Sequence, residues 1–305
     1  MSLRDLPGLR LNTTPRKGIL PIYQEGATIP KILHQTYSSR ALPENILENV
    51  KRIRAMNPSW DYRFYDESDR TLFIKDEYGV QMLKYYRKIS QEYRAARADL
   101  FRYLVLYRHG GVYLDVKSTA TRPLDKVVMS TDCFLLSHWK NTRGGPYPGW
   151  GLHPELKNLE HGEFQQWFIV SVPGHPFLQA IIENVLGNLD RYTPGLHRTG
   201  AWAVFRVTGP IAYSLAIAPL LHEAPHRIVD SEEDLGFRYS IFDNPAEQAH
   251  KKIFTSHYAE LKTSLTYVGK TKTAIFAVYR VIAAIYKFFA ARPALLMHNE
   301  RHGVS

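Results

Sequence analysis

The sequence has 305 residues, 45% of them hydrophobic and 22% charged, so the chain can bury a large core and its composition argues against disorder as the default state. A single cysteine, Cys133, excludes an internal disulfide framework and a zinc site made only of cysteines, and it fits a reducing compartment. The formal net charge of +10 implies attraction to polyanions, but no nucleic-acid-binding motif is present and we expect no nucleic-acid partner.

The first part of the chain alternates between strand-like and helix-like patterns. Short apolar or alternating runs, typical of strands, occupy 29–36 and 61–65. A helix is predicted from 43–45 to about residue 55, and Asp66 or Ser68 can cap a second helix that runs through residue 78. This order of strand, helix, strand and helix predicts an α/β fold.

The segment 92–115 holds the strongest pattern. Apolar residues recur at helical spacing over 92–109, and Gly110-Gly111 ends that helix as a pair of C-capping glycines does. Residues 112–116 then form a short apolar strand whose single carboxylate, Asp115, stands at the carboxyl end. In open α/β sheets ligands bind beyond the carboxyl ends of strands, so Asp115 is expected to meet a substrate.

Residues 139–163 are rich in Gly, Pro, aromatic residues and His, which predicts a long loop. Long loops on such scaffolds are usually functional or mobile, and this one carries the aromatic residues Trp139, Tyr147 and Trp150. Trp60 and Trp167 are expected in the core. The remaining predicted elements are a strand over 164–172, helices over 175–189 and 208–220, and strands over 227–230 and 252–257.

The tail differs from the rest of the chain. Residues 274–291 are apolar except for Arg280 and Lys287, which stand seven residues apart on one helical face. Two interpretations are open: an amphipathic helix on an anionic membrane surface, or a terminal helix packed on the domain or on a partner subunit. The first 20 residues hold no continuous apolar run, so we expect a cytoplasmic protein that is peripheral on the membrane if the tail binds lipid.

Four segments, in chain order, share motifs with a known family. The most specific is Arg97 to Tyr103, followed by Gly110-Gly111-Val112-Tyr113-Leu114-Asp115 and Arg122-Pro123-Leu124-Asp125. The others are 29–36, 57–62, and a weaker set made of 171–176, 208–210 and His257. Together they span most of the chain, which resembles glycosyltransferase family 32, the DXD sugar-binding group related to yeast mannosyltransferases.

The resemblance implies a GT-A-like (Rossmann-like) mixed sheet flanked by helices, in a single catalytic domain. We divide the chain into an N-terminal extension (1–28), the transferase domain (29–268) and a basic amphipathic helix with its tail (269–305). The implied reaction moves a hexose from UDP- or GDP-hexose to a hydroxyl of a glycan or lipid-linked acceptor in cell-surface polysaccharide synthesis, with retention of configuration. A catalytically silent nucleotide-sugar-binding protein is the main rival, and a basic nucleic-acid-binding protein is a weaker one.

The resemblance also assigns roles to residues. Asp99 and Arg102 match the aspartate and arginine that contact the donor sugar, although their spacing of three equally suits an ordinary helical ion pair. Asp115 matches the first aspartate of Asp-X-Asp, expected near the ribose and a divalent metal. His34 and Gln35, at the end of the first strand, would lie at the nucleobase by analogy, and core packing explains them equally well.

The second position of the Asp-X-Asp motif is Lys117, which departs from the family. A carboxylate there normally binds Mn²⁺ or Mg²⁺, and a charged lysine cannot. Three hypotheses are open: Lys117 places its ammonium near the donor diphosphate and partly replaces the metal; Asp115, with His257, still holds the cation; or the chain has lost activity. Tyr113 and His257 complete the residues expected at the donor. Aromatic faces commonly stack on sugar rings, so the loop with Trp139, Tyr147 and Trp150 is our candidate for acceptor binding or lid closure.

Overall fold

The computed structural model describes residues 14–242 and 258–267, and their central feature is a six-stranded mixed sheet. Its strand order is β2-β1-β3-β6-β5-β7. β1 runs parallel to both β2 and β3, whereas β6 is antiparallel to its neighbours β3 and β5. The strands are β1 (Ile32–Thr36), β2 (Asp61–Tyr65), β3 (Gly111–Leu114), β5 (Phe134–Leu136), β6 (Phe168–Ser171) and β7 (Arg227–Ile228), with β4 (Thr119–Ala120) and β8 (Phe237–Arg238) in a separate antiparallel pair.

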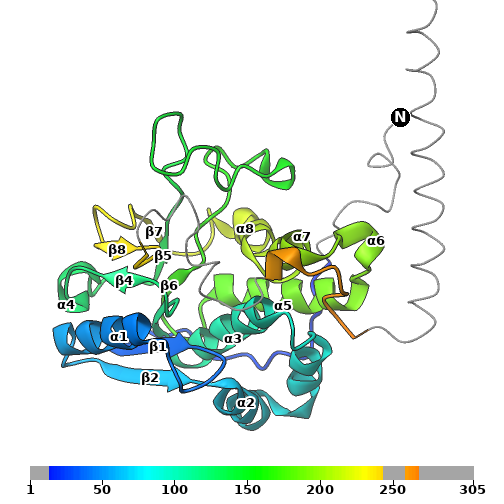
Figure 1. The fold of residues 1–305 in the computed structure, drawn as a ribbon, viewed down its shortest axis with the longest axis horizontal. Coiled ribbons are helices and arrows are strands. Elements are labelled where there is room, and N and C mark those ends of the chain that lie inside the picture. Colours follow the sequence, from blue (N-terminus) through cyan, green and yellow to red (C-terminus); the bar gives the residue numbers. More distant parts are fainter. Residues whose placement is uncertain (1–13, 243–257, 268–305) are drawn as a thin grey trace, which may run out of the picture.

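Helices cover both faces of this sheet. In Figure 1, α1 and α4 lie on its left and α3, α5, α7 and α8 lie on its right. The helices are α1 (Glu44–Met56), α2 (Glu67–Lys88), α3 (Arg94–His109), α4 (Leu124–Val127), α5 (Pro176–Arg191), α6 (Pro194–His197), α7 (Gly200–Val207) and α8 (Pro210–Ile217). The predicted α/β class, with a mixed sheet flanked by helices, is confirmed.

The alternation of side chains along β3 divides the core between the two faces. Tyr113 packs into the larger cluster, which includes the apolar faces of α2, α3, α5 and α7. Val112 and Leu114 point the other way, into a cluster with Ile53 of α1 and Leu124 of α4. Because all these side chains are buried, the strand is apolar on both faces, as its sequence suggested.

The paired glycines before β3 are needed for close packing. Gly110 and Gly111 have φ angles of 64° and 99°, in the region that favours glycine. A Cβ on Gly111 would lie 2.5 Å from the carbonyl oxygen of Ile32, and one on Gly110 would lie 2.6 Å from Cδ of Pro173. The glycines therefore let α3 end directly against the edge of β1 and bring β3 into the sheet.

Several predicted boundaries need correction. The strand predicted over 164–172 is shorter, because residues 164 and 165 donate their backbone N–H groups to Ser214 and Ser137 instead of continuing the ladder. The helix predicted to end at residue 78 continues to Lys88 through a kink at Gly79. The helix predicted over 208–220 comprises α8 and a 3₁₀ turn at Ala218–Leu220. The sequence did not predict six short elements: β4, α4, β5, α6, α7 and β8. The predicted strand over 252–257 and helix over 274–291 lie outside the described residues.

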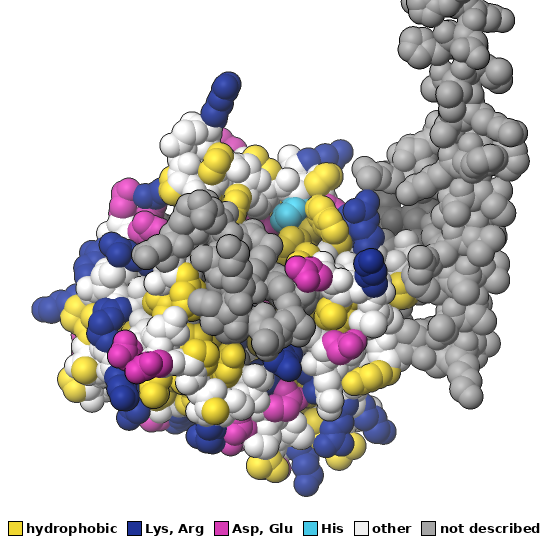
Figure 2. All heavy atoms as spheres, in the orientation of Figure 1, with side chains coloured by type: hydrophobic (Ala, Val, Ile, Leu, Met, Phe, Trp, Pro, Cys, Tyr) yellow, Lys and Arg dark blue, Asp and Glu magenta, His cyan; other side chains and the backbone are white. Residues whose placement is uncertain are grey.

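Residues 14–28 lie along the domain. The backbone N–H of Arg16 bonds to the carbonyl of Glu183 in α5, and Leu20 is buried in the larger core cluster. The face of the molecule seen in Figure 2 carries Lys and Arg side chains interspersed with Asp and Glu. The stretch Gly200–Leu220 is long and apolar enough to cross a membrane by length and composition. However, 56% of its most apolar part is buried in the domain, as in a core helix.

Candidate functional site

A cavity of about 530 Å³ opens beyond the carboxyl ends of β1 and β3. Its walls come from the end of β1, from α3, from the turn after β3, from the loop 139–163 and from α7. Five of the expected donor-site residues line it: Asp99, Arg102, Tyr113, Asp115 and Lys117. This position agrees with the general rule for ligand binding in open α/β sheets.

Arg102 lies at the centre of the polar end of this cavity. One of its terminal nitrogens is 3.2 Å from Oδ1 of Asp99 and 3.0 Å from Oδ1 of Asp115. The other donates to the backbone carbonyl of Gln166 at 2.6 Å, and the guanidinium lies 4.7 Å from the ring centre of Tyr113. Arg102 therefore joins an acid on α3 to an acid after β3, which the sequence separates by 16 positions.

Asp99 is held by three donors and is almost completely buried. Oδ2 accepts a hydrogen bond from the hydroxyl of Thr208 at 2.9 Å, and Oδ1 accepts one from Nε2 of Gln166 at 3.3 Å. Burial raises the pKa of the Asp99 carboxyl to about 6, against the opposing effects of Arg102 and the Thr208 hydroxyl. Asp99 and Arg102 therefore form a buried ion pair in the cavity wall. They are not the exposed ion pair that their spacing of three would equally suit.

A tight turn places Asp115 and Lys117 on the same cavity wall. The N–H of Ser118 donates to the carbonyl of Asp115 at 2.8 Å, and Oδ1 of Asp115 also accepts the hydroxyl of Tyr113 at 3.1 Å. The Lys117 ammonium lies 3.7 Å from the ring centre of Tyr239, a cation–π contact. Burial lowers the pKa of Lys117 to about 8, and Asp115 opposes that shift.

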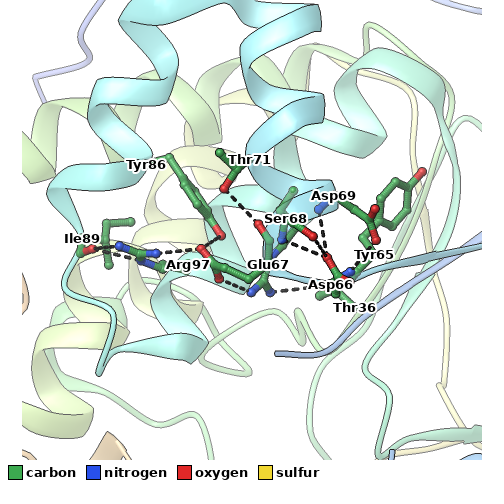
Figure 3. Close-up of polar contacts among 11 residues, drawn as sticks. Thr36, Tyr65, Asp66, Glu67, Ser68, Asp69, Thr71, Tyr86, Ile89 and Arg97 are labelled. Carbon is green, nitrogen blue, oxygen red and sulfur yellow. Dashed lines mark hydrogen bonds and ion pairs between the residues drawn. The ribbon is translucent and has the colours of Figure 1, made fainter. Parts of the chain in front are cut away.

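The helix that carries Asp99 and Arg102 is anchored by a second network, shown in Figure 3. Oε1 of Glu67, in the first turn of α2, accepts hydrogen bonds from Arg97 of α3 at 2.7 Å and from the hydroxyl of Tyr86 at 3.1 Å. Arg70 pairs with the other oxygen of Glu67 and also donates to Thr36 at the end of β1. This network fixes α3 against α2 and the end of β1, next to the cavity.

His34 and Gln35 lie in the core beside the cavity and do not line it. The ring nitrogens of His34 contact the carbonyl of Gly110 at 3.0 Å and the hydroxyl of Tyr65 at 3.2 Å, and burial lowers the pKa of the imidazole to about 3. Gln35 accepts the hydroxyl of Tyr62 and contacts the carbonyl of Asp115 at 3.5 Å. Both therefore support the strand ends; the next residue of β1, Thr36, is the one that reaches the cavity.

Three buried donors on cavity-lining residues have no hydrogen-bond partner among the described residues. They are Nε of Arg70, Nε of Arg102 and Nε1 of Trp167. Buried polar groups in proteins are nearly always bonded, so three unpaired donors on residues that line one cavity are an exception to the rule.

The described residues do not by themselves form a metal site. Within 14–242 and 258–267 there is no group of three His, Cys, Asp or Glu side chains that could hold a metal ion. Asp115 is instead paired with Arg102, and the Lys117 ammonium lies on the same wall. The second expected ligand, His257, lies outside the described residues.

Other cavity residues were not expected from the sequence. Gln166 bonds to both Asp99 and Arg102, and Tyr239 contacts Lys117, but neither stands in a recognisable motif. Trp167, expected in the core, is buried and also lines the cavity, and Trp139 and Trp150 line it as the loop prediction suggested. Tyr147 packs behind them, 4.9 Å from the ring of Trp139.

Comparison with known proteins gives consistent matches. Residues 43–134 match the family described as "Glycosyltransferase sugar-binding region containing DXD motif". Inositol phosphoceramide mannosyltransferase 3 of Schizosaccharomyces pombe is 26% identical over 191 residues, covering 63% of this chain and 45% of that protein. A mannosyl phosphorylinositol ceramide synthase of Saccharomyces cerevisiae is 27% identical over 221 residues, covering 66% and 56%.

The chain spans about half the length of the curated relatives it matches. Among solved structures, a PaToxG glycosyltransferase superposes with a TM-score of 0.45 at 12% identity, over 85% of this chain and 88% of that one.

Proposed function

We propose that this chain, a member of the glycosyltransferase family with a DXD sugar-binding region, transfers a hexose from a nucleoside diphosphate sugar to a hydroxyl of a glycan or glycolipid. The observation that carries the proposal is the cavity in which Arg102 joins Asp99 to Asp115, next to buried donors that lack partners among the described residues. Several relatives are named as mannosyltransferases, so mannose is the first hexose to test.

The residues divide between the sugar and the diphosphate. Asp99 can accept hydrogen bonds from sugar hydroxyls, and Arg102 holds it in place while its Nε can donate to the ligand. We assign Asp115 and Tyr113 to the ribose side of the donor. All four residues line one cavity.

Lys117 supplies positive charge to the donor diphosphate in this proposal. Negative charge grows on the diphosphate as the glycosidic bond breaks, and a nearby cation stabilises that state. The second hypothesis, in which Asp115 and His257 hold Mn²⁺ or Mg²⁺, makes a contrasting prediction: a chelator would then abolish turnover. Turnover of the wild-type protein in excess EDTA, compared with added Mn²⁺, decides between the two.

The reaction proposed is retaining. The acceptor oxygen forms a bond to the anomeric carbon, the bond from that carbon to the diphosphate oxygen breaks, and the departing diphosphate takes the acceptor proton. No strong general base is therefore required. We place the enzyme in the cytoplasm, at a membrane surface if the segment 274–291 binds anionic lipid, with the transferase domain over 29–268.

A panel of UDP- and GDP-hexoses, scored for released nucleoside diphosphate, tests the function. Asp99→Asn and Asp115→Asn should each lower the release by at least tenfold with the preferred donor. Asp190→Asn is the matched control, since Asp190 is half-exposed and pairs with Lys88, away from the cavity. Wild-type rates in both site variants would defeat the assignment; donor binding by the wild-type protein without any release would instead indicate a silent binding protein.

A further inference from the structure

A carboxylate–imidazole pair lies in the cavity wall formed by the loop 139–163, and the roles above do not use it. Oε2 of Glu163 is 2.8 Å from Nε2 of His153. Oε1 of Glu163 accepts the indole N–H of Trp139 at 2.7 Å. All three residues line the cavity, and the side chains of Glu163 and His153 are only 9% and 13% exposed.

The carboxylate fixes which imidazole nitrogen is free to accept. An ionised carboxylate can only accept hydrogen bonds, so Nε2 of a neutral His153 carries the proton and Nδ1 keeps its lone pair. Nδ1 has no hydrogen bond to any described residue. In its neutral form, His153 therefore offers an acceptor of the kind that binds a hydroxyl hydrogen.

Packing holds this pair in one orientation. Gly151 has a φ of 73°, and a Cβ there would lie 2.6 Å from Cγ of Glu163, so the Glu163 side chain rests directly on the glycine backbone. The His153 ring is enclosed by Trp202 at 5.9 Å and Phe205 at 5.7 Å between ring centres. A fixed ring with a free acceptor is suited to orienting a hydroxyl.

The surrounding wall suggests what carries that hydroxyl. Trp150 lines the cavity and is partly exposed, which leaves an aromatic surface for a sugar ring. Ala201, Val204 and Phe205 add an apolar strip from α7. A glycoside with an alkyl group matches a wall that offers one fixed polar acceptor among aromatic and aliphatic side chains.

We propose that His153, oriented by Glu163, is the acceptor subsite: its Nδ1 accepts a hydrogen bond from a hydroxyl of a glycoside whose apolar group lies along α7. This inference rests on the proposed transferase function. His153 contacts the acceptor. Glu163 positions the His153 ring, and Trp139 holds Glu163 in place. The donor residues lie on other walls of the same cavity, as transfer from a bound donor to a bound acceptor requires.

The test uses octyl α-mannoside and methyl α-mannoside as acceptor probes, with the full chain. Two quantities are measured: the ratio of sugar transferred to donor hydrolysed, and the affinity of each glycoside by calorimetry without donor. His153→Phe keeps a ring against Trp202 and Phe205 but removes both nitrogens. His153→Gln retains an acceptor oxygen, and His161→Gln, on an exposed residue of the same loop, is the matched control.

We expect His153→Phe to lower the transfer ratio and the affinity for octyl mannoside at least tenfold, with His153→Gln between it and the wild type. The control should match the wild type, and octyl mannoside should bind at least tenfold more tightly than methyl mannoside. If His153→Phe fails to fold, as judged by near-UV circular dichroism, His153→Gln carries the comparison alone.

A ratio and an affinity within twofold of the wild type in the His153 variants would overturn the subsite. Donor hydrolysis without transfer to or binding of either glycoside would overturn its assignment to a glycoside. Absence of any donor hydrolysis in the wild-type protein would count against the transferase function, and the binding measurements would then still decide whether His153 holds a glycoside.

Discussion

Replacing Asp99 by asparagine should make the stability of the protein less dependent on pH. The pKa of this carboxyl is about 6 in the folded chain, against 3.8 for the free group, and burial is the main cause. The folded state therefore holds the proton more tightly than the unfolded state does. Stability from this group is fully present below the unfolded pKa and is lost as the pH rises through about 6.

The size of the effect follows from the shift. A difference of about two pKa units corresponds to about 3 kcal/mol between the protonated and ionised extremes. Roughly half of this is lost between pH 5 and pH 8, because the unfolded carboxyl is already ionised at pH 5 while the folded one is not. The asparagine side chain of the variant cannot ionise. Its amide oxygen can still accept from Arg102, and its amide nitrogen can donate to the Thr208 hydroxyl.

Urea unfolding at pH 5 and pH 8 measures this difference. The wild-type protein should lose about 1.5 kcal/mol more stability than Asp99→Asn does over this interval. Asp190→Asn makes the same chemical change at a half-exposed residue and should follow the wild type. Identical pH dependence in the wild type and in Asp99→Asn would refute the reasoning that burial governs this carboxyl.

Arg102→Lys should lower donor turnover about 100-fold in steady-state kinetics, since lysine cannot bond Asp99, Asp115 and Gln166 at once; a loss under threefold would contradict this. In turnover assays with excess EDTA, the wild-type protein should stay active, whereas the Lys117→Asp variant should require added Mn²⁺. Loss of wild-type turnover in EDTA would contradict the role given to Lys117. In thermal melts, Gly151→Ala should destabilise the fold by about 1–3 kcal/mol more than Gly149→Ala. Both glycines have positive φ, but only a Cβ at position 151 would meet the Glu163 side chain. Equal losses of stability would contradict the close packing of Glu163 on Gly151.

The sequence predicts the core of the site because its signals are local. The apolar spacing of α3 predicts a helix in the core, and Gly110-Gly111 marks where the helix ends and β3 begins. Asp66 was recognised as a helix cap for the same reason, since it bonds to the N–H groups of the next turn. Such features depend on a few neighbouring residues and need no knowledge of the sheet.

The rest of the site depends on sheet order, which local patterns do not contain. β6 lies antiparallel beside β3, with Phe168 opposite Leu114. The residues just before β6 therefore meet the residue just after β3: the carbonyl of Trp167 accepts the N–H of Asp115 at 2.8 Å, and Gln166 reaches Arg102. A parallel β6 would place Gln166 at the opposite end of the sheet, so its part in the site follows from the direction of one strand.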